Sequence, residues 1–88
     1  MERVSVTDLY QASYFLLSGA QLESIQCIPA GRDVLCHLVF EGSGLTELQN
    51  DYFSKSAVVN LFSFRSAYSQ VSSYVASAKR TYKKGGQV

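Results

Sequence analysis

The amino-acid sequence predicts a small α+β domain with the element order β-α-β-β-α-α, in which a three-stranded antiparallel sheet is packed by the first helix and a long C-terminal helix. Two runs of alternating apolar and polar residues, joined by a turn that contains Pro and Gly, predict a β-hairpin. Apolar residues then recur at spacings of three and four over residues 61–82, which predicts an amphipathic helix. With 88 residues, of which 47% are hydrophobic, the chain has the composition of one folded domain with a modest core.

The first two predicted elements are a short strand and a helix. Residues 3–6 alternate between polar and apolar side chains, as a half-buried strand does. A hairpin alone is only marginally stable, so we expect this strand to complete the sheet. Thr7 is predicted to cap the following helix, residues 8–18, with Asp8 in its first turn. Gly19 is predicted to end it in the left-handed conformation.

The hairpin is predicted from residues 23–27 and 34–40, with a turn at residues 29–32. If Ile28 lies opposite Asp33, one face is apolar and is predicted to be the core face: Ile25, Cys27, Val34, Cys36, Leu38 and Phe40. The other face is too mixed to be fully buried and too apolar to be fully exposed: Ser24, Gln26, Ile28, Leu35, His37, Val39 and Glu41.

Two helices are predicted in the second half of the chain. Residues 42–44 break the strand, and a short helix with Leu45, Leu48, Tyr52 and Phe53 follows. Asn60 is predicted to cap the last helix. Its apolar stripe is Leu61, Phe64, Tyr68, Val71, Val75, Ala78 and Tyr82. This helix either packs on the sheet as a core helix or pairs with another copy through its distal turns, although the positions flanking the stripe lack the acids of a coiled coil.

The domain is predicted to span residues 1–82, with residues 83–88 as a flexible basic and Gly-containing tail. The predicted centre of the core is one cluster: Leu16, Leu38, Phe40, Phe64, Tyr68 and Val71.

The sequence contains few residues that could carry catalysis. His37 is the only histidine, and it alternates with Cys36 on the predicted strand, so the two cannot ligate one metal. Cys27 and Cys36 are expected to be buried free thiols. The Gly-Ser-Gly at residues 42–44 is interpreted either as a strand exit with Ser43 capping the next helix or as a backbone phosphate site.

Glu47 and Asp51 have the spacing of paired carboxylates on one helix face, but a solvated acidic face is the preferred interpretation. We therefore expect a protein that is not an enzyme, with no cofactor, no metal and no identified small-molecule substrate.

Charge is distributed unevenly along the chain. Residues 1–51 carry seven acids and two arginines, a net charge of −5, whereas residues 52–88 carry six cations and no acid, a net charge of +6. Four of these cations cluster near the end of the chain: Lys79, Arg80, Lys83 and Lys84. They are either a solvated helix terminus or a weak, nonspecific contact for the phosphate backbone of a nucleic acid.

The mixed sheet face suggests self-association. Ile28, Leu35 and Val39 are the candidate interface residues of a homodimer in which each acidic half lies beside the partner's basic half. The sequence lacks an apolar run of about 18 residues and a signal peptide's apolar stretch, so we expect a cytoplasmic protein without a membrane partner. The predicted function is a protein-interaction or binding module, with a nucleic-acid-associated accessory protein as the alternative.

Several short motifs resemble one known family. They are Asp8-Leu9-Tyr10, Ser13 to Leu16 with Gly19, Leu22 with Ile25, Leu38 to Glu41, Asp51 to Phe53, and Val58 to Asn60. Over residues 4–75 the pattern is similar to small, uncharacterised bacterial and phage-associated domains of unknown function. These motifs are mostly those of packing and capping, so the resemblance implies a fold and carries no activity.

Overall fold

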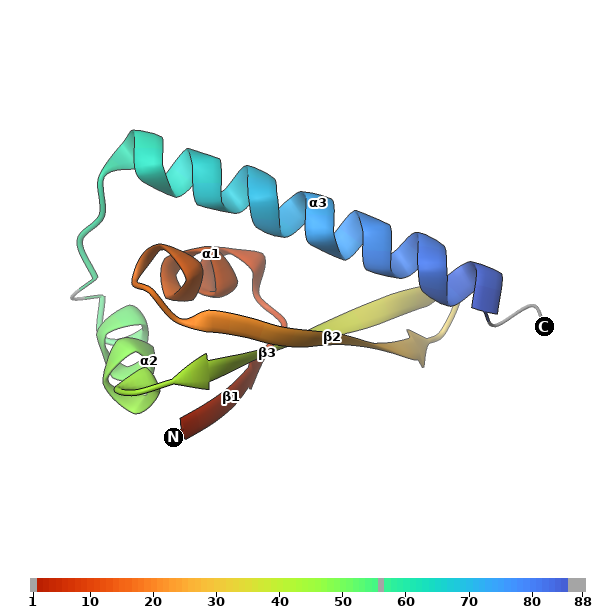
Figure 1. Cartoon of the computed structure of the whole chain (residues 1–88), viewed down its shortest axis with the longest axis horizontal. Coiled ribbons are helices and arrows are strands. Elements are labelled where there is room, and N and C mark those ends of the chain that lie inside the picture. The colour runs from red at the N-terminus through yellow and green to blue at the C-terminus, as the bar shows by residue number, and fades with distance from the viewer. Residues whose placement is uncertain (1, 56, 86–88) are drawn as a thin grey trace.

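The computed structural model describes residues 2–55 and 57–85, the last two by their backbone, and confirms the predicted α+β fold and element order. The elements are β1 (Glu2–Val6), α1 (Leu9–Leu17), β2 (Gln21–Ala30), β3 (Asp33–Gly42), α2 (Leu45–Phe53) and α3 (Leu61–Gly85). The strands form one antiparallel sheet in the order β1-β3-β2 (Figure 1). The long β3 is therefore central, and β2 is an edge strand over its whole length.

The hairpin turn is tighter than the sequence pattern suggested. Ala30 pairs with Asp33, so the loop has two residues, and Gly31 at its first position has φ 64°. A positive φ at that position is what a type II′ turn requires, and such turns match the twist of the flanking strands. The predicted register with Ile28 opposite Asp33 is therefore wrong by two residues. Because the shift is even, every side chain keeps its predicted face.

The core lies between the inner face of the sheet and the helices. On β3, Leu38 and Phe40 are fully buried, and the Phe40 ring meets that of Phe15 from α1 edge to face at 5.5 Å between centroids. Helix α2 adds Leu45, and α3 adds Val71. The predicted cluster is therefore correct for Leu38, Phe40 and Val71, which are buried together. It is also correct for Leu16, which is partly buried and packs against them.

Two aromatic residues of the predicted cluster lie at the margin of the core. Phe64 is only partly buried, and Tyr68 is half-buried with its ring stacked on that of Tyr10 at 5.1 Å. Phe64 also stacks on Tyr10, at 6.3 Å. Their helix turns rest on α1, which separates them from the sheet, so they cannot reach the inner face of the strands.

Helix α3 packs along α1 and then over β2 and β3 near the hairpin turn (Figure 1). As predicted, Asn60 caps it: its Oδ1 accepts a hydrogen bond from the Ser63 N–H at 3.1 Å. Leu61 is 68% exposed, because the helix begins beyond the edge of the core. The helix includes Lys83, which was predicted to begin a flexible tail; residues 86–88 of that tail lie outside the described residues.

The first two helices are capped by residues other than those predicted. Asp8 caps α1, since its Oδ1 accepts from the Tyr10 N–H at 2.9 Å; Thr7 does not. At α2 the N-cap is Gly44 at φ 74°, with no side-chain cap of its own. The carboxylate of Glu2 on β1 takes this role and accepts from the Gly44 N–H at 2.7 Å.

Glu2 thereby occupies the helix terminus that was considered as a phosphate site. Its other oxygen accepts from the N–H of Thr46 at 3.1 Å and from the Thr46 hydroxyl. An anion at the N-terminus of a helix is favoured by the unpaired N–H groups and the helix dipole. The chain therefore supplies its own anion here, and Ser43 is exposed.

The Glu2 contact predicts a pH effect on stability. Hydrogen bonds, first from the Thr46 side chain, lower the pKa of Glu2. The ionised carboxylate therefore stabilises the fold at neutral pH. This stabilisation is lost as the pH falls through the lowered pKa. Glu2→Gln should therefore lose less thermal stability than the wild type between about pH 6 and pH 3. Glu47→Gln, on an exposed α2 position, should follow the wild type. Equal melting-temperature profiles for the wild type and Glu2→Gln would contradict the capping role.

Candidate interaction groove

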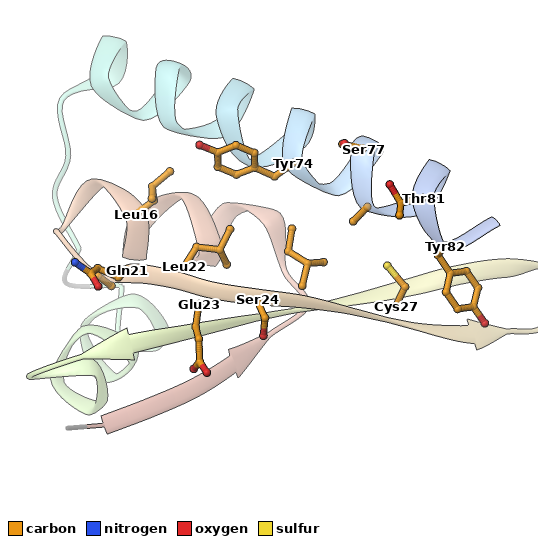
Figure 2. Close-up of a pocket in the computed structure, with 13 residues that line it drawn as sticks. Leu16, Gln21, Leu22, Glu23, Ser24, Cys27, Tyr74, Ser77, Thr81 and Tyr82 are labelled. Atoms are coloured by element: carbon orange, nitrogen blue, oxygen red, sulfur yellow. The ribbon is translucent and has the colours of Figure 1, made fainter. Parts of the chain in front are cut away.

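An open groove of about 900 Å³ lies between β2 and α3. In Figure 2, β2 runs along one side and α3 along the other, with Leu16 of α1 near one end. The apolar part of its lining consists of Leu16, Ala20, Leu22, Ile25, Cys27, Tyr74, Ala78 and Tyr82. Side chains of the core-facing side of β2 thus remain accessible from the edge of the sheet.

The β2 strand borders this groove with an unpaired backbone edge. Pairing with β3 occupies one side of β2, and within the described part of the chain no strand pairs with the other. Counting from the two-residue turn, Ile25 and Cys27 fall at non-hydrogen-bonded pairs, so their N–H and C=O groups point away from β3. Pro29 also falls at a non-hydrogen-bonded pair, so its lack of an N–H removes no hydrogen bond to β3. This is the usual position of Pro on an edge strand.

The opposite wall of the groove is formed by the C-terminal half of α3. Tyr74 is 39% exposed, and Ser77 and Thr81, one turn apart, are exposed small side chains between Tyr74 and Tyr82 (Figure 2). Small residues at these positions leave the space between the helix and β2 open. The predicted apolar stripe of the helix contained Ala78 and Tyr82, but it could not show that an open groove remains between this part of α3 and β2.

The groove has the chemistry of a binding surface. Its one ionised side chain is Glu23, whose carboxylate is paired with Arg3 at 2.8 Å. The other polar groups of the lining are the amide of Gln21 and hydroxyls of Ser, Thr and Tyr. An apolar groove with hydroxyls and a free backbone edge can accept an extended chain through main-chain hydrogen bonds and shallow side-chain contacts.

The predicted interface residues are separated by the fold. Ile28 and Leu35 are cross-strand partners on the outer sheet face and are 47% and 44% exposed. Val39 is buried, at 9% exposure, because it occupies the central strand between neighbours on β1 and β2. Arg3 also crosses this face, since its guanidinium reaches Glu41 on β3 as well as β2. The exposed apolar pair is therefore confined to the hairpin end, and Val39 does not belong to it.

The predicted basic cluster is also divided. Lys79 Nζ lies 3.9 Å from Asp33 Oδ1 at the hairpin turn. The pKa of Asp33 is lowered, first by the hydrogen bond from the Val34 N–H and then by the charges of Lys79 and Lys83. Arg80 is exposed on an adjoining face of α3, and the side chain of Lys84 lies outside the described residues. Two of the four cations, Lys79 and Lys83, thus lie near an acid of the same chain.

The two cysteines lie opposite each other on the core side of the hairpin. Their Sγ atoms are 3.2 Å apart, and both are free thiols, with Cys36 buried as expected and Cys27 only half-buried. Burial, followed by the hydrogen bond with Cys27, raises the pKa of Cys36 to about 11. His37 is on the other face, where its Nδ1 lies 3.4 Å from the Ser5 hydroxyl.

The acidic residues of α2 do not form a paired site, since Glu47 and Asp51 are both exposed there. Over residues 2–55 and 57–85, no group of three or more His, Cys, Asp or Glu side chains is arranged to hold a metal ion.

Four large apolar residues between the end of α2 and the start of α3 are exposed, which was not predicted from the sequence. They are Phe53, Val58, Leu61 and Phe62, which are 63%, 91%, 68% and 74% exposed. The signal in the sequence is that Val58 precedes the last helix and Phe62 falls outside its apolar stripe.

Comparison of the chain with protein-family models, curated proteins and solved structures found no match. Among the described residues, no helix combines the length and apolar character needed to cross a membrane. The class of protein is defined by the fold and the groove alone: it is a small α+β domain with an open groove beside an edge strand.

Proposed function

We propose that this protein is a non-enzymatic interaction module that binds an extended chain segment as an additional strand on β2. The observation that carries the proposal is the free β2 edge beside an apolar groove of about 900 Å³. In strand addition, main-chain hydrogen bonds supply affinity and the adjoining groove accepts alternate side chains. The unpaired edge of β2, which is interrupted by a register shift between Leu22 and Ser24 and by Pro29 near the turn, is otherwise a site of uncontrolled association, so a dedicated partner also protects it.

The partner in this proposal is β2 of a second copy, added antiparallel about a two-fold axis. Such an axis makes the same surface serve both subunits, so each free edge satisfies the other. The two sheets would join into one of six strands. The α3 helices would lie beside each other over the joined edges, and the two grooves would be covered together.

The distribution of charge supports the antiparallel arrangement. The molecule is 43 Å long and 28 Å wide, with the hairpin turn and the end of α3 at one end of its long axis and α2 at the other (Figure 1). The first end carries Arg32, Lys79, Arg80 and Lys83 against one acid, Asp33. The α2 end carries Glu2, Glu41, Glu47 and Asp51 against Arg3 and Lys55. An antiparallel pair places the basic end of each copy beside the acidic end of the other, an attraction that salt weakens.

Sedimentation equilibrium at micromolar concentration tests this function. The wild type should be a dimer whose dissociation constant increases with salt. Ser77→Arg introduces a charge into the groove, and Ala76→Arg introduces the same charge on the opposite face of α3, where Ala76 is exposed. Burying an unpaired charge at an interface typically costs 2 to 5 kcal/mol, so Ser77→Arg should weaken the dimer by about 30-fold or more. Ala76→Arg should leave it unchanged.

Two results would contradict the proposal. A monomer at low salt and high micromolar concentration would exclude a second copy as the partner. A dimer that Ser77→Arg does not weaken would place the interface elsewhere, on the apolar start of α3 or on the outer face beside Ile28 and Leu35.

A further inference from the structure

Cys27 and Cys36 occupy directly opposed positions on β2 and β3, with their Sγ atoms 3.2 Å apart. The alternation from the turn makes this a non-hydrogen-bonded pair, where opposed Cα atoms are about 4.5 Å apart and side chains are closest. A disulfide spans Cα separations of about 4.4 to 6.8 Å. The strands therefore hold the two cysteines at a separation that a disulfide can span. Closing the bond brings the Sγ atoms from 3.2 Å to about 2.05 Å and requires little backbone movement.

The two thiols differ in their access from solvent. Cys27 is half-buried and lines the groove, whereas Cys36 is buried behind it and does not line the groove. A small reagent that enters the groove meets Cys27 first and reaches Cys36 only through Cys27. This is the arrangement of an attacking thiol and a resolving thiol.

We propose that Cys27 and Cys36 form an oxidisable dithiol site whose substrate is a low-molecular-weight disulfide. The Cys27 thiolate attacks one sulfur of that disulfide, which forms a mixed disulfide and releases one small thiol. The Cys36 thiolate then attacks Cys27 Sγ, which forms the internal disulfide and releases the second small thiol. In total the protein loses two protons and two electrons, and the small disulfide gains them.

The environment of Cys36 indicates how ring closure depends on pH. The thiolate is the nucleophile, and burial raises the pKa of Cys36 to about 11. Lys79 opposes this rise, while Asp33 and Cys27 add to it. Ring closure by Cys36 is therefore expected to accelerate as pH increases.

The test is incubation of the reduced protein with oxidised glutathione, followed by intact mass measurement and thiol alkylation. It is run at a protein and salt concentration at which sedimentation shows a monomer, so that the groove beside Cys27 is open whether or not the proposed dimer forms. The wild type should pass through a glutathionyl adduct to a monomeric chain lighter by two hydrogens, with neither thiol open to alkylation. Cys36→Ala should stop at the adduct on Cys27, and Cys27→Ser should remain unmodified. Oxidation should raise the melting temperature of the wild type by roughly 10 to 20 °C, because the crosslink restricts the unfolded chain.

A wild type that stops at the adduct, or remains reduced, would overturn the proposal. A Cys27-to-Cys27 crosslink between two chains would also overturn it, but it would support the shared β2 edge of the proposed dimer. The two proposals therefore fail separately, because the dithiol is read from the mass of the monomer and the dimer from sedimentation of the reduced protein.

Discussion

Replacing Phe40 by Ala is expected to lower the free energy of unfolding by about 3 to 5 kcal/mol. Phe40 is fully buried on the central strand and packs edge to face against Phe15 of α1. The substitution removes the aromatic pair and leaves a cavity that the sheet cannot close, since β3 is held by strands on both sides. For a domain of this size, the loss is most of the total stability.

Phe64→Ala is the matched comparison. The sequence pattern placed Phe64 in the same predicted core cluster as Phe40, since it lies on the apolar stripe of the last helix. It is only partly buried in the structure and stacks on Tyr10, so its loss should be about 1 to 2 kcal/mol. Urea denaturation, followed by circular dichroism, measures both variants. If Phe64→Ala costs as much as Phe40→Ala, then α3 packs more deeply than the structure shows.

Replacing Val71 by Asp is expected to cost more than about 3 kcal/mol, because it places an uncompensated carboxylate at a fully buried position. Val71 lies in the middle of α3 and belongs to the core cluster. The carboxylate can return to water only if α3 moves away from the core. The same variant should therefore also lose the groove and, with it, the proposed dimer.

Ser73→Asp is the control, since it adds the same charge two residues away at an exposed position of the same helix. Its effect should lie within about 0.5 kcal/mol of the wild type. Near-wild-type stability in Val71→Asp would mean that this face of α3 is not packed against the core.

Local patterns in the sequence predicted the elements that depend on neighbouring residues. The alternation over β2 and β3 assigned each side chain to the correct face, because the side-chain period of a strand is two residues whatever its register. Gly19, at φ 94°, ends α1 as predicted, and Asn60 caps α3. Each of these features depends on the chain within a few residues.

Other features depend on residues distant in the chain, and local patterns could not predict them. The cap of α2 comes from Glu2, more than 40 residues earlier, because β1 begins beside the start of that helix. Val39 is buried because its strand is central, a position set by the order of strands in the sheet. Phe64 lies at the margin because α1 stands between its helix turn and the sheet.

The sequence by itself determined the fold class, the order of the elements and the two faces of the hairpin, because backbone preferences and apolar periodicity are local properties. The tertiary structure alone decided the free β2 edge, the groove beneath α3 and the contact between Cys27 and Cys36. These depend on the pairing register, the strand order and the angle at which a 25-residue helix crosses the sheet. Those three quantities are set by packing between segments far apart in the chain.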